Sequence, residues 1–121
     1  MADGFKILAQ ATLTGSEVAI YTVPTPSGGR FATRGNSQAV ISSIILCCTG
    51  GGSSTYSIRV KENSTVSDSP SELIFNNQAI ALADTDVLSL GIGLVSGNLI
   101  KASLAGGSAA IQMNIFGTEV L

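Results

Sequence analysis

Residues 39–49 (AVISSIILCCT) are the most continuously apolar run of the chain, and this run decides the fold. Successive side chains of a strand point to opposite faces, and both faces of this run are largely apolar. β-branched residues are frequent and three glycines (50–52) close the run, which favours a strand over the competing interpretation, a buried helix. The pattern predicts a central strand that is covered on both sides. Its two alternating sets are Val40, Ser42, Ile44, Leu46 and Cys48, and Ile41, Ser43, Ile45 and Cys47.

Segments on both sides of this run are also predicted to be strands. They are residues 5–13, 17–23, 55–61, 72–76, 87–94, 99–104 and 109–120. Alternation is most regular in 55–61, where Tyr56, Ile58 and Val60 are expected to face the core. The pair Asn76–Asn77 suits a tight turn, residues 78–86 are expected to be irregular, and 96–98 (SGN) predict a hairpin turn.

The first two predicted strands show weaker patterns. In residues 5–13, Phe5, Ile7 and Ala9 fall on one apolar face, and Leu8 is an exception to the alternation. This segment is read as a half-buried strand. Residues 17–23 are read as a second strand, in which Val18 and Ile20 are set against Glu17, Ala19 and Tyr21.

About eight short strands at fairly even spacing, without a sustained helical period, indicate an all-β protein. We predict a single β-sandwich or jelly-roll-like domain of about eight short antiparallel strands. The 121 residues fit one domain, 1–121, that is large enough to bury a core. Within it, residues 1–14 are predicted to be an N-terminal docking segment and strand, and residues 25–38 an extended loop.

The loop 25–38 (TPSGGRFATRGNSQ) carries Phe31 between Arg30 and Arg34. A loop of this length in a compact domain is usually functional or disordered. Two interpretations therefore stay open. The loop is either an arm that docks on a partner with Phe31 as its anchor, or a plain connection.

The composition limits the classes of function. Charged residues make up only 12% of the chain and the net charge is −2, with no run of basic residues, which disfavours nucleic-acid binding. So few charges indicate either a surface that is buried against partners or a compact sandwich with a Ser/Thr-rich surface. The N-terminus shows neither a leader nor a membrane-spanning segment, so synthesis in a cytoplasm and no membrane contact are expected.

The residues offer little for chemistry. The chain has no histidine, which removes the common Ser-His-Asp and Cys-His nucleophile systems and most zinc sites. Adjacent Cys47 and Cys48 are read as buried small hydrophobes, and Asp84 and Asp86 as a solvated turn with too few oxygens for calcium. We therefore predict no catalytic residue, no metal and no cofactor. A small glycan hydrolase is the least favoured class, and a carboxylate pair in a cleft would revive it.

Several motifs in a fixed order resemble a known family. Residues 20–24 (IYTVP) and 38–44 (QAVISSI) are followed by Cys47, a Gly/Ser/Thr turn and the alternating 56–60 (YSIRV). With the hairpin 87–101 and the ending 114–120 (NIFGTEV), they resemble small virion proteins of tailed bacteriophages, including phages of marine cyanobacteria. The resemblance covers residue 17 to the C-terminus. The chain departs from the family in its longer 25–38 gap and in Cys48, where the family tends to have asparagine.

The resemblance implies a virion structural protein and no enzyme. Our main hypothesis is a capsid decoration (cement) protein, a homotrimer on the capsid exterior, which bridges neighbouring major capsid protein subunits through many shallow contacts. The contact residues are expected to be Phe5, Arg30, Phe31 and Arg34. The alternative is a tail-fibre or receptor-binding module, which predicts exposed aromatic clusters or acidic cation sites at one end of the sandwich.

Overall fold

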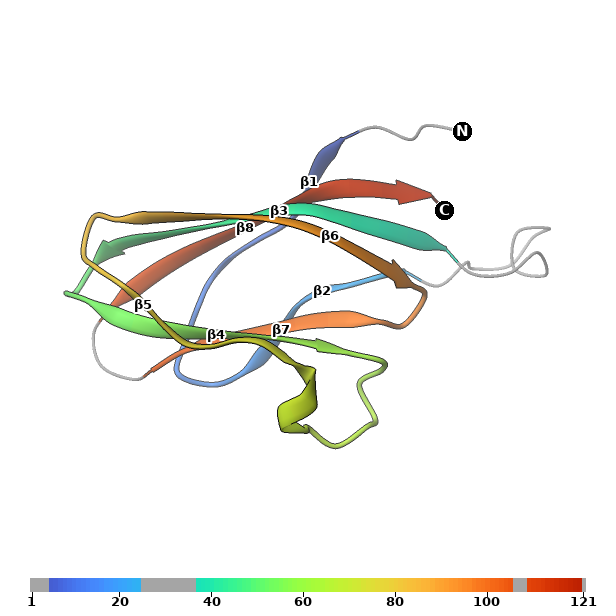
Figure 1. Ribbon diagram of the computed structural model, residues 1–121, viewed down its shortest axis with the longest axis horizontal. Coiled ribbons are helices and arrows are strands. Elements are labelled where there is room, and N and C mark those ends of the chain that lie inside the picture. Colours follow the sequence, from blue (N-terminus) through green and yellow to red (C-terminus); the bar gives the residue numbers. More distant parts are fainter. Residues whose placement is uncertain (1–4, 25–36, 106–108, 121) are drawn as a thin grey trace.

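The computed structural model describes residues 5–24, 37–105 and 109–120, and shows two antiparallel four-stranded sheets packed face to face (Figure 1). Sheet A contains, in spatial order, β1 (Lys6–Thr12), β8 (Ala110–Val120), β3 (Gln38–Gly50) and β6 (Thr85–Val95). Sheet B contains, in spatial order, β2 (Val18–Thr22), β7 (Leu99–Leu104), β4 (Ser54–Lys61) and β5 (Leu73–Ile80). The predicted β-sandwich of about eight antiparallel strands is confirmed.

The strand pairing follows the jelly-roll pattern. β1 pairs with β8, β2 with β7, β3 with β6 and β4 with β5, so the first half of the chain pairs with the second half in reverse order. The pairings of β3 with β8 and of β4 with β7 complete the two sheets. The described residues contain one short 3-10 turn, η2 (Pro70–Glu72), and no helix among them has the length and hydropathy to cross a membrane.

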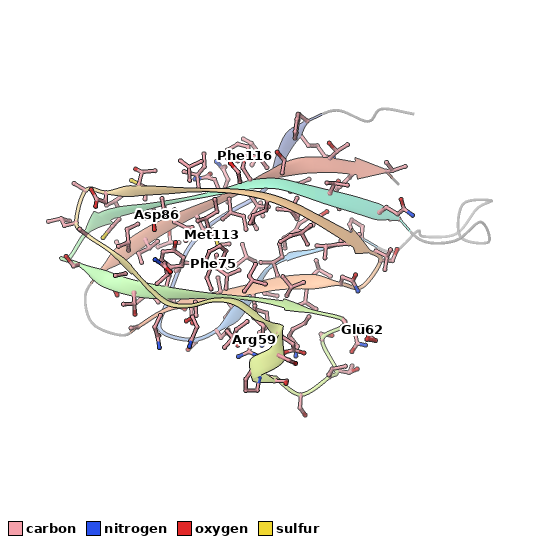
Figure 2. All side chains as sticks on the ribbon, viewed as in Figure 1. Arg59, Glu62, Phe75, Asp86, Met113 and Phe116 are labelled. Atoms are coloured by element: carbon pink, nitrogen blue, oxygen red, sulfur yellow. The ribbon has the colours of Figure 1, made fainter. Side chains whose placement is uncertain are left out.

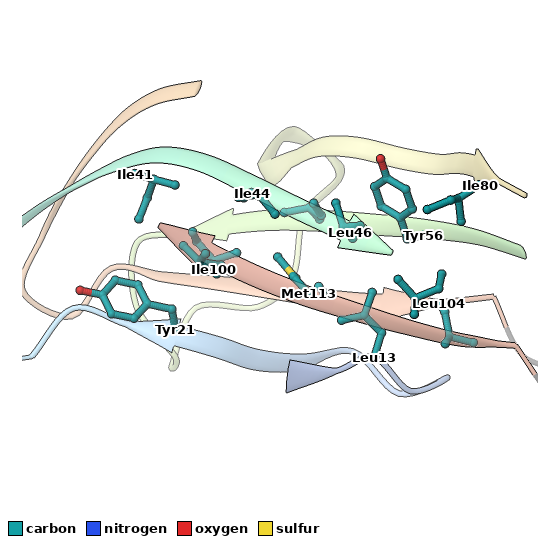
Figure 3. Packing of buried hydrophobic residues seen from close by; sticks show 14 of the residues in the cluster. Leu13, Tyr21, Ile41, Ile44, Leu46, Tyr56, Ile80, Ile100, Leu104 and Met113 are labelled. Atoms are coloured by element: carbon teal, nitrogen blue, oxygen red, sulfur yellow. The ribbon is translucent and has the colours of Figure 1, made fainter. Parts of the chain in front are cut away.

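The core lies between the two sheets (Figure 3). Sheet A contributes the inward side chains of β3 and β8, and sheet B contributes those of β4 and β7. Burying each large apolar side chain stabilises the fold by about 1.5–3 kcal/mol. The fully buried side chains include Ile41, Ile44, Leu46, Ile111, Met113 and Ile115 from sheet A, and Tyr56, Ile58 and Ile100 from sheet B.

β3 is central in its sheet, as predicted, because it lies between β8 and β6. The prediction that it is covered on both sides is wrong within this chain. Ile44 and Leu46 face sheet B, whereas Val40 is 51% exposed and Ile45 is half-buried on the opposite side. A bulge at Ser42 also breaks the predicted alternation, because the pairing with β8 shifts register there.

Bulges also correct the predicted faces of the first two strands. In β1 the register shifts between Ile7 and Ala9, so Leu8, the exception in the pattern, is the extra residue. Ile7 is therefore exposed, and Phe5 is 74% exposed instead of lying on a buried face. In β2 a similar shift brings Tyr21 to the inward face, where it pairs with Ile100, whereas Val18, opposite Ala102 on the edge strand, is 43% exposed.

The predicted tight turn at Asn76–Asn77 is wrong. β5 continues through it to Ile80, so the expected irregular segment begins with strand residues. Asn77 adopts a φ of 51° inside a bulge, and its backbone N–H donates to the Ser57 hydroxyl at 3.0 Å. Asparagine tolerates this left-handed conformation, so the pair forms a bulge in place of a turn. The predicted hairpin turn at 96–98 is confirmed, with a φ of 86° at Gly97.

All four edge strands are bulged. β1, β2 and β5 each contain at least one extra residue relative to their neighbour, and in β6 the two residues Leu90 and Gly91 lie opposite Ser42 alone. A bulge twists a free edge away from the geometry that pairs with another sheet. The edges of this sandwich are therefore poorly suited to adding strands from another molecule.

Gly117 in β8 allows a close approach of two strands. A Cβ atom at this position would lie 2.0 Å from the Val40 carbonyl oxygen and 3.0 Å from Leu8 Cδ1. We expect Gly117→Ala to lower the free energy of unfolding by about 1–3 kcal/mol, because the backbone has to move. Urea denaturation measures this. The control is Gly93→Ala, where nothing lies within 4 Å of the new Cβ, and equal stability of the two variants would contradict the prediction.

Candidate docking face

The side of sheet A that faces away from sheet B forms one surface, which we call the outer face. Residues that pair directly across strands share a face, and Ile45 pairs with both Asn114 and Val87. Figure 2 shows Phe116 on this outer side and Met113 between the sheets. The outer face consists of Ile7, Gln10 and Thr12 of β1, Gln112, Asn114, Phe116 and Thr118 of β8, Val40, Ser43, Ile45 and Cys47 of β3, and Thr85, Val87, Ser89, Gly93 and Val95 of β6.

No charged side chain belongs to the outer face. The strands of sheet A contain three charged residues, Lys6, Asp86 and Glu119. Asp86 accepts a hydrogen bond from Tyr56 of sheet B at 2.8 Å, so it points toward the other sheet. Glu119 accepts one from Tyr21 of sheet B and forms an ion pair with Lys6 at 2.8 Å. The two carboxylates of sheet A therefore point toward sheet B, and Lys6 is paired with one of them.

The polar side chains of the outer face bond to one another. The Gln10 side-chain amide donates to the side-chain oxygen Oδ1 of Asn114 at 2.7 Å. The Thr12 hydroxyl donates to the side-chain oxygen Oε1 of Gln112 at 2.6 Å. The Gln112 amide donates in turn to the Thr49 hydroxyl at 3.3 Å. A polar group that already has a partner costs less to remove from water. These pairs make the outer face easier to bury than its amide content suggests.

A shallow groove of about 380 Å³ opens at the β1 side of the outer face. Phe5, Lys6 and Ile7, which we call the N-terminal rim, form one side of it. Of the predicted contact residues, Phe5 is thus exposed beside a groove. The other three, Arg30, Phe31 and Arg34, lie outside the described residues. The remaining lining residues of the groove are Ser42, Ser43 and Phe116.

The outer side of sheet B has the opposite character, because it holds a charged network of three basic and three acidic side chains. Arg59, labelled beside η2 in Figure 2, is one of its basic members. Lys61 is only 2% exposed, so its ammonium group is fully engaged with its partners. The pairs are Arg59–Glu17 at 3.0 Å, Arg59–Glu72 at 3.2 Å, Lys61–Asp68 at 2.9 Å, Lys61–Glu72 at 3.1 Å, Lys101–Asp68 at 3.4 Å and Lys101–Glu17 at 3.8 Å.

The charged network ties the connection between β4 and β5 to sheet B. The hydrogen bond from Lys61 lowers the pKa of Asp68 to about 2, and the Ser69 backbone N–H lowers the pKa of Glu72. Glu72 also closes a capping box with Ser69 at the start of η2. The connection is thus held by groups that must be ionised to bind.

Acid should loosen this connection. The pKa values of Asp68 and Glu72 are lower in the folded state than in an unfolded chain, where they are about 4. Their contribution to stability is therefore present above about pH 4 and is lost as the pH falls toward about 2. Urea midpoints measured between these values should fall less steeply with pH in Asp68→Asn than in the unmodified protein. The exposed Glu62→Gln is the control, and an unchanged slope in Asp68→Asn would refute this role.

Two carboxylates bond to tyrosines, but they do not form a pair. Burial and the hydrogen bonds to Glu119 and Asp86 raise the pKa of Tyr21 and of Tyr56, so both hydroxyls stay protonated. Asp86 and Glu119 lie opposite β3 residues seven positions apart, which is about 23 Å at about 3.3 Å per residue. The two carboxylates of a glycosidase lie about 5–9.5 Å apart. That no enzyme activity is present stays a prediction.

A lateral cleft of about 360 Å³ opens between the edges of β5 and β6. The rings of Tyr56 and Phe75 lie 6.5 Å apart there, and Asp86 is on the same cleft, half-buried and not in the solvated turn that was predicted. The other lining residues are Gln78, Thr85, Val87 and Leu88. In the described ranges, no group of three or more His, Cys, Asp or Glu side chains is placed to hold a metal ion.

Sequence patterns missed most of the outer face. Val87 is 62% exposed, and Val40 and Ile45 lie beside it, yet none of them was predicted as a contact residue. The sequence did contain an indication of this surface, because the strand 39–49 is apolar on both faces. That pattern led to the prediction that the chain itself covers both faces of the strand. Cys48 is buried as predicted, whereas Cys47 lies half-buried on the outer face.

Comparisons with known proteins leave the family open. A scan against protein-family models, a search of curated proteins and a search of solved structures each found no match. Function has to be inferred from the surfaces described above and from the resemblance of the motifs.

Proposed function

We propose that this chain is a virion structural protein of a tailed bacteriophage, a decoration protein that binds the major capsid protein on the outside of the head. Its N-terminal rim, together with the loop 25–38, makes the contact. The mechanism is mechanical, because the protein bridges neighbouring capsid subunits without covalent chemistry. The sequence also predicts that the decoration protein is a homotrimer.

The observation that carries this proposal is an exposed aromatic side chain on a rigid scaffold. Phe5 is 74% exposed and stands beside a groove that has Phe116 in its lining. Large aromatic side chains that enter a pocket of the partner are the usual energetic centres of protein interfaces. β1, which follows Phe5 at once, is hydrogen-bonded to β8 and anchors the backbone next to the ring.

The fold and the motifs are compatible with this role. Jelly rolls are frequent in viral capsid proteins, although they also occur in lectins and enzymes, so the fold supports the proposal by analogy only. The motif order that resembles phage virion proteins spans β2 to β8. A protein present in many copies on a symmetric shell needs little energy per contact, because the contacts act together.

Phe5→Ala tests the proposal. We expect the variant to bind phage heads stripped of this protein about 30-fold more weakly, the equivalent of about 2 kcal/mol for an aromatic hot spot. Its thermal stability should stay the same, because the ring is exposed. Co-sedimentation with the heads measures the occupancy, and Val66→Ala, on the exposed β4–β5 connection, is the control. Full occupancy by Phe5→Ala would argue against the N-terminal rim as the contact.

The lateral cleft favours a second candidate function, a receptor-binding module of the virion. It combines an aromatic ring, Phe75, with the carboxylate of Asp86, and this pairing suits the apolar and hydroxyl faces of a sugar. The cleft lies on the open side of the sandwich and not at its end. Binding on a glycan array that is lost in Phe75→Ala would support this function, and an array without binding would remove it.

A further inference from the structure

β3 is apolar on both faces, but the described part of the chain covers only one of them. Val40 is 51% exposed, and Ile45 and Cys47 are half-buried on the outer face. Val87 of the neighbouring β6 is 62% exposed beside Ile45. A strand that is apolar on both sides is typical of a sheet with a layer against each face. The pattern therefore points to a second layer over the outer face that residues 5–24, 37–105 and 109–120 do not supply.

The other surfaces of the sandwich are less suited to a large contact. The outer side of sheet B carries the charged network, and the β4–β5 connection lies over part of it. The edges of both sheets are bulged, which disfavours the addition of strands. Among the described surfaces, the outer face is the broad one without charges.

We propose that a second copy of this chain covers the outer face, and that the two copies form a two-fold dimer. In a two-fold contact the same surface patch is buried on both copies, so each charged residue on it would be removed from water twice. The outer face has no such residue. The side chains of Gln10, Asn114 and Gln112 already make hydrogen bonds within each copy, which lowers the cost of burying them.

The size of the face fits such a contact. Ten residues along the strands at about 3.3 Å each, and four strands at about 4.8 Å spacing, give a projected area of about 600 Å². A standard protein interface buries about 800 Å² on each partner, a value that a corrugated surface of this extent approaches. The second sheet would pack about 10 Å away with aligned strands, as the two sheets of one sandwich do.

The dimer contact and the proposed capsid contact have different centres, although Ile7 belongs to both the N-terminal rim and the outer face. The dimer contact is centred on Val40, Ile45 and Val87 of β3 and β6, whereas Phe5 stands at the β1 margin of the face. A two-fold contact gives a dimer of two chains. In this proposal the dimer replaces the homotrimer that the sequence led us to expect.

The mass of the isolated protein in solution tests the dimer. Interfaces of this size have dissociation constants that reach the micromolar range at their weakest. At a protein concentration of about 100 μM, analytical ultracentrifugation should therefore give a mass twice the 12.2 kDa of one chain. Val87→Lys should give a monomer, because each copy would bury a lysine that has no partner. Val66→Lys is the matched control, since Val66 is also exposed but lies on the β4–β5 connection, and it should stay a dimer.

Cys47 provides a second readout, because it lies on the outer face while Cys48 is buried in the core. Its reaction with a thiol reagent should be slow in the dimer and faster in Val87→Lys. Circular dichroism checks that the variant is folded, and Val40→Lys takes its place if it is not. A monomeric or trimeric unmodified protein, or a dimer that persists in the folded lysine variant, would overturn the proposal. A dimer that persists in Phe5→Ala while head binding is lost separates this contact from the capsid contact.

Discussion

The structure depends on the position of β3 between β8 and β6, with its inward side chains packed on sheet B. Ile41, Ile44 and Leu46 are fully buried in this arrangement, and β3 pairs along nearly its whole length on both sides. The jelly-roll order follows, since the strands before and after β3 must reach both sheets in turn.

The two outer surfaces of the sandwich differ in their electrostatics. Sheet B concentrates the charges: the described residues contain four basic side chains, and three of them, Arg59, Lys61 and Lys101, lie in its charged network. Sheet A leaves its outer face to apolar groups and to polar groups that bond to one another. One side is thus suited to water and the other to contact, as the low charge content of the whole chain suggested.

Periodicity predicted the elements well, because alternation with period two is the direct consequence of strand geometry. The central run and the 99–104 strand follow from it, whereas the turn at Gly97 was predicted from the left-handed φ that Gly and Asn tolerate. The bulges at Leu8, Ser42 and Asn77 did not follow from periodicity, because each depends on which strand lies opposite, and pairing is a tertiary property. The bulges at Leu8 and Ser42 leave Ile7 and Val40 exposed on sheet A.

An electron cryo-microscopy map of the assembled particle tests the central claim most directly, because it shows which surface of the sandwich faces another chain. If sheet A lies between sheet B and a neighbouring chain, Val40, Ile45 and Val87 will contact that chain, and Arg59 and Lys101 will face solvent. A map in which the outer face of sheet A is bathed in water while the charged side of sheet B is buried would contradict the account.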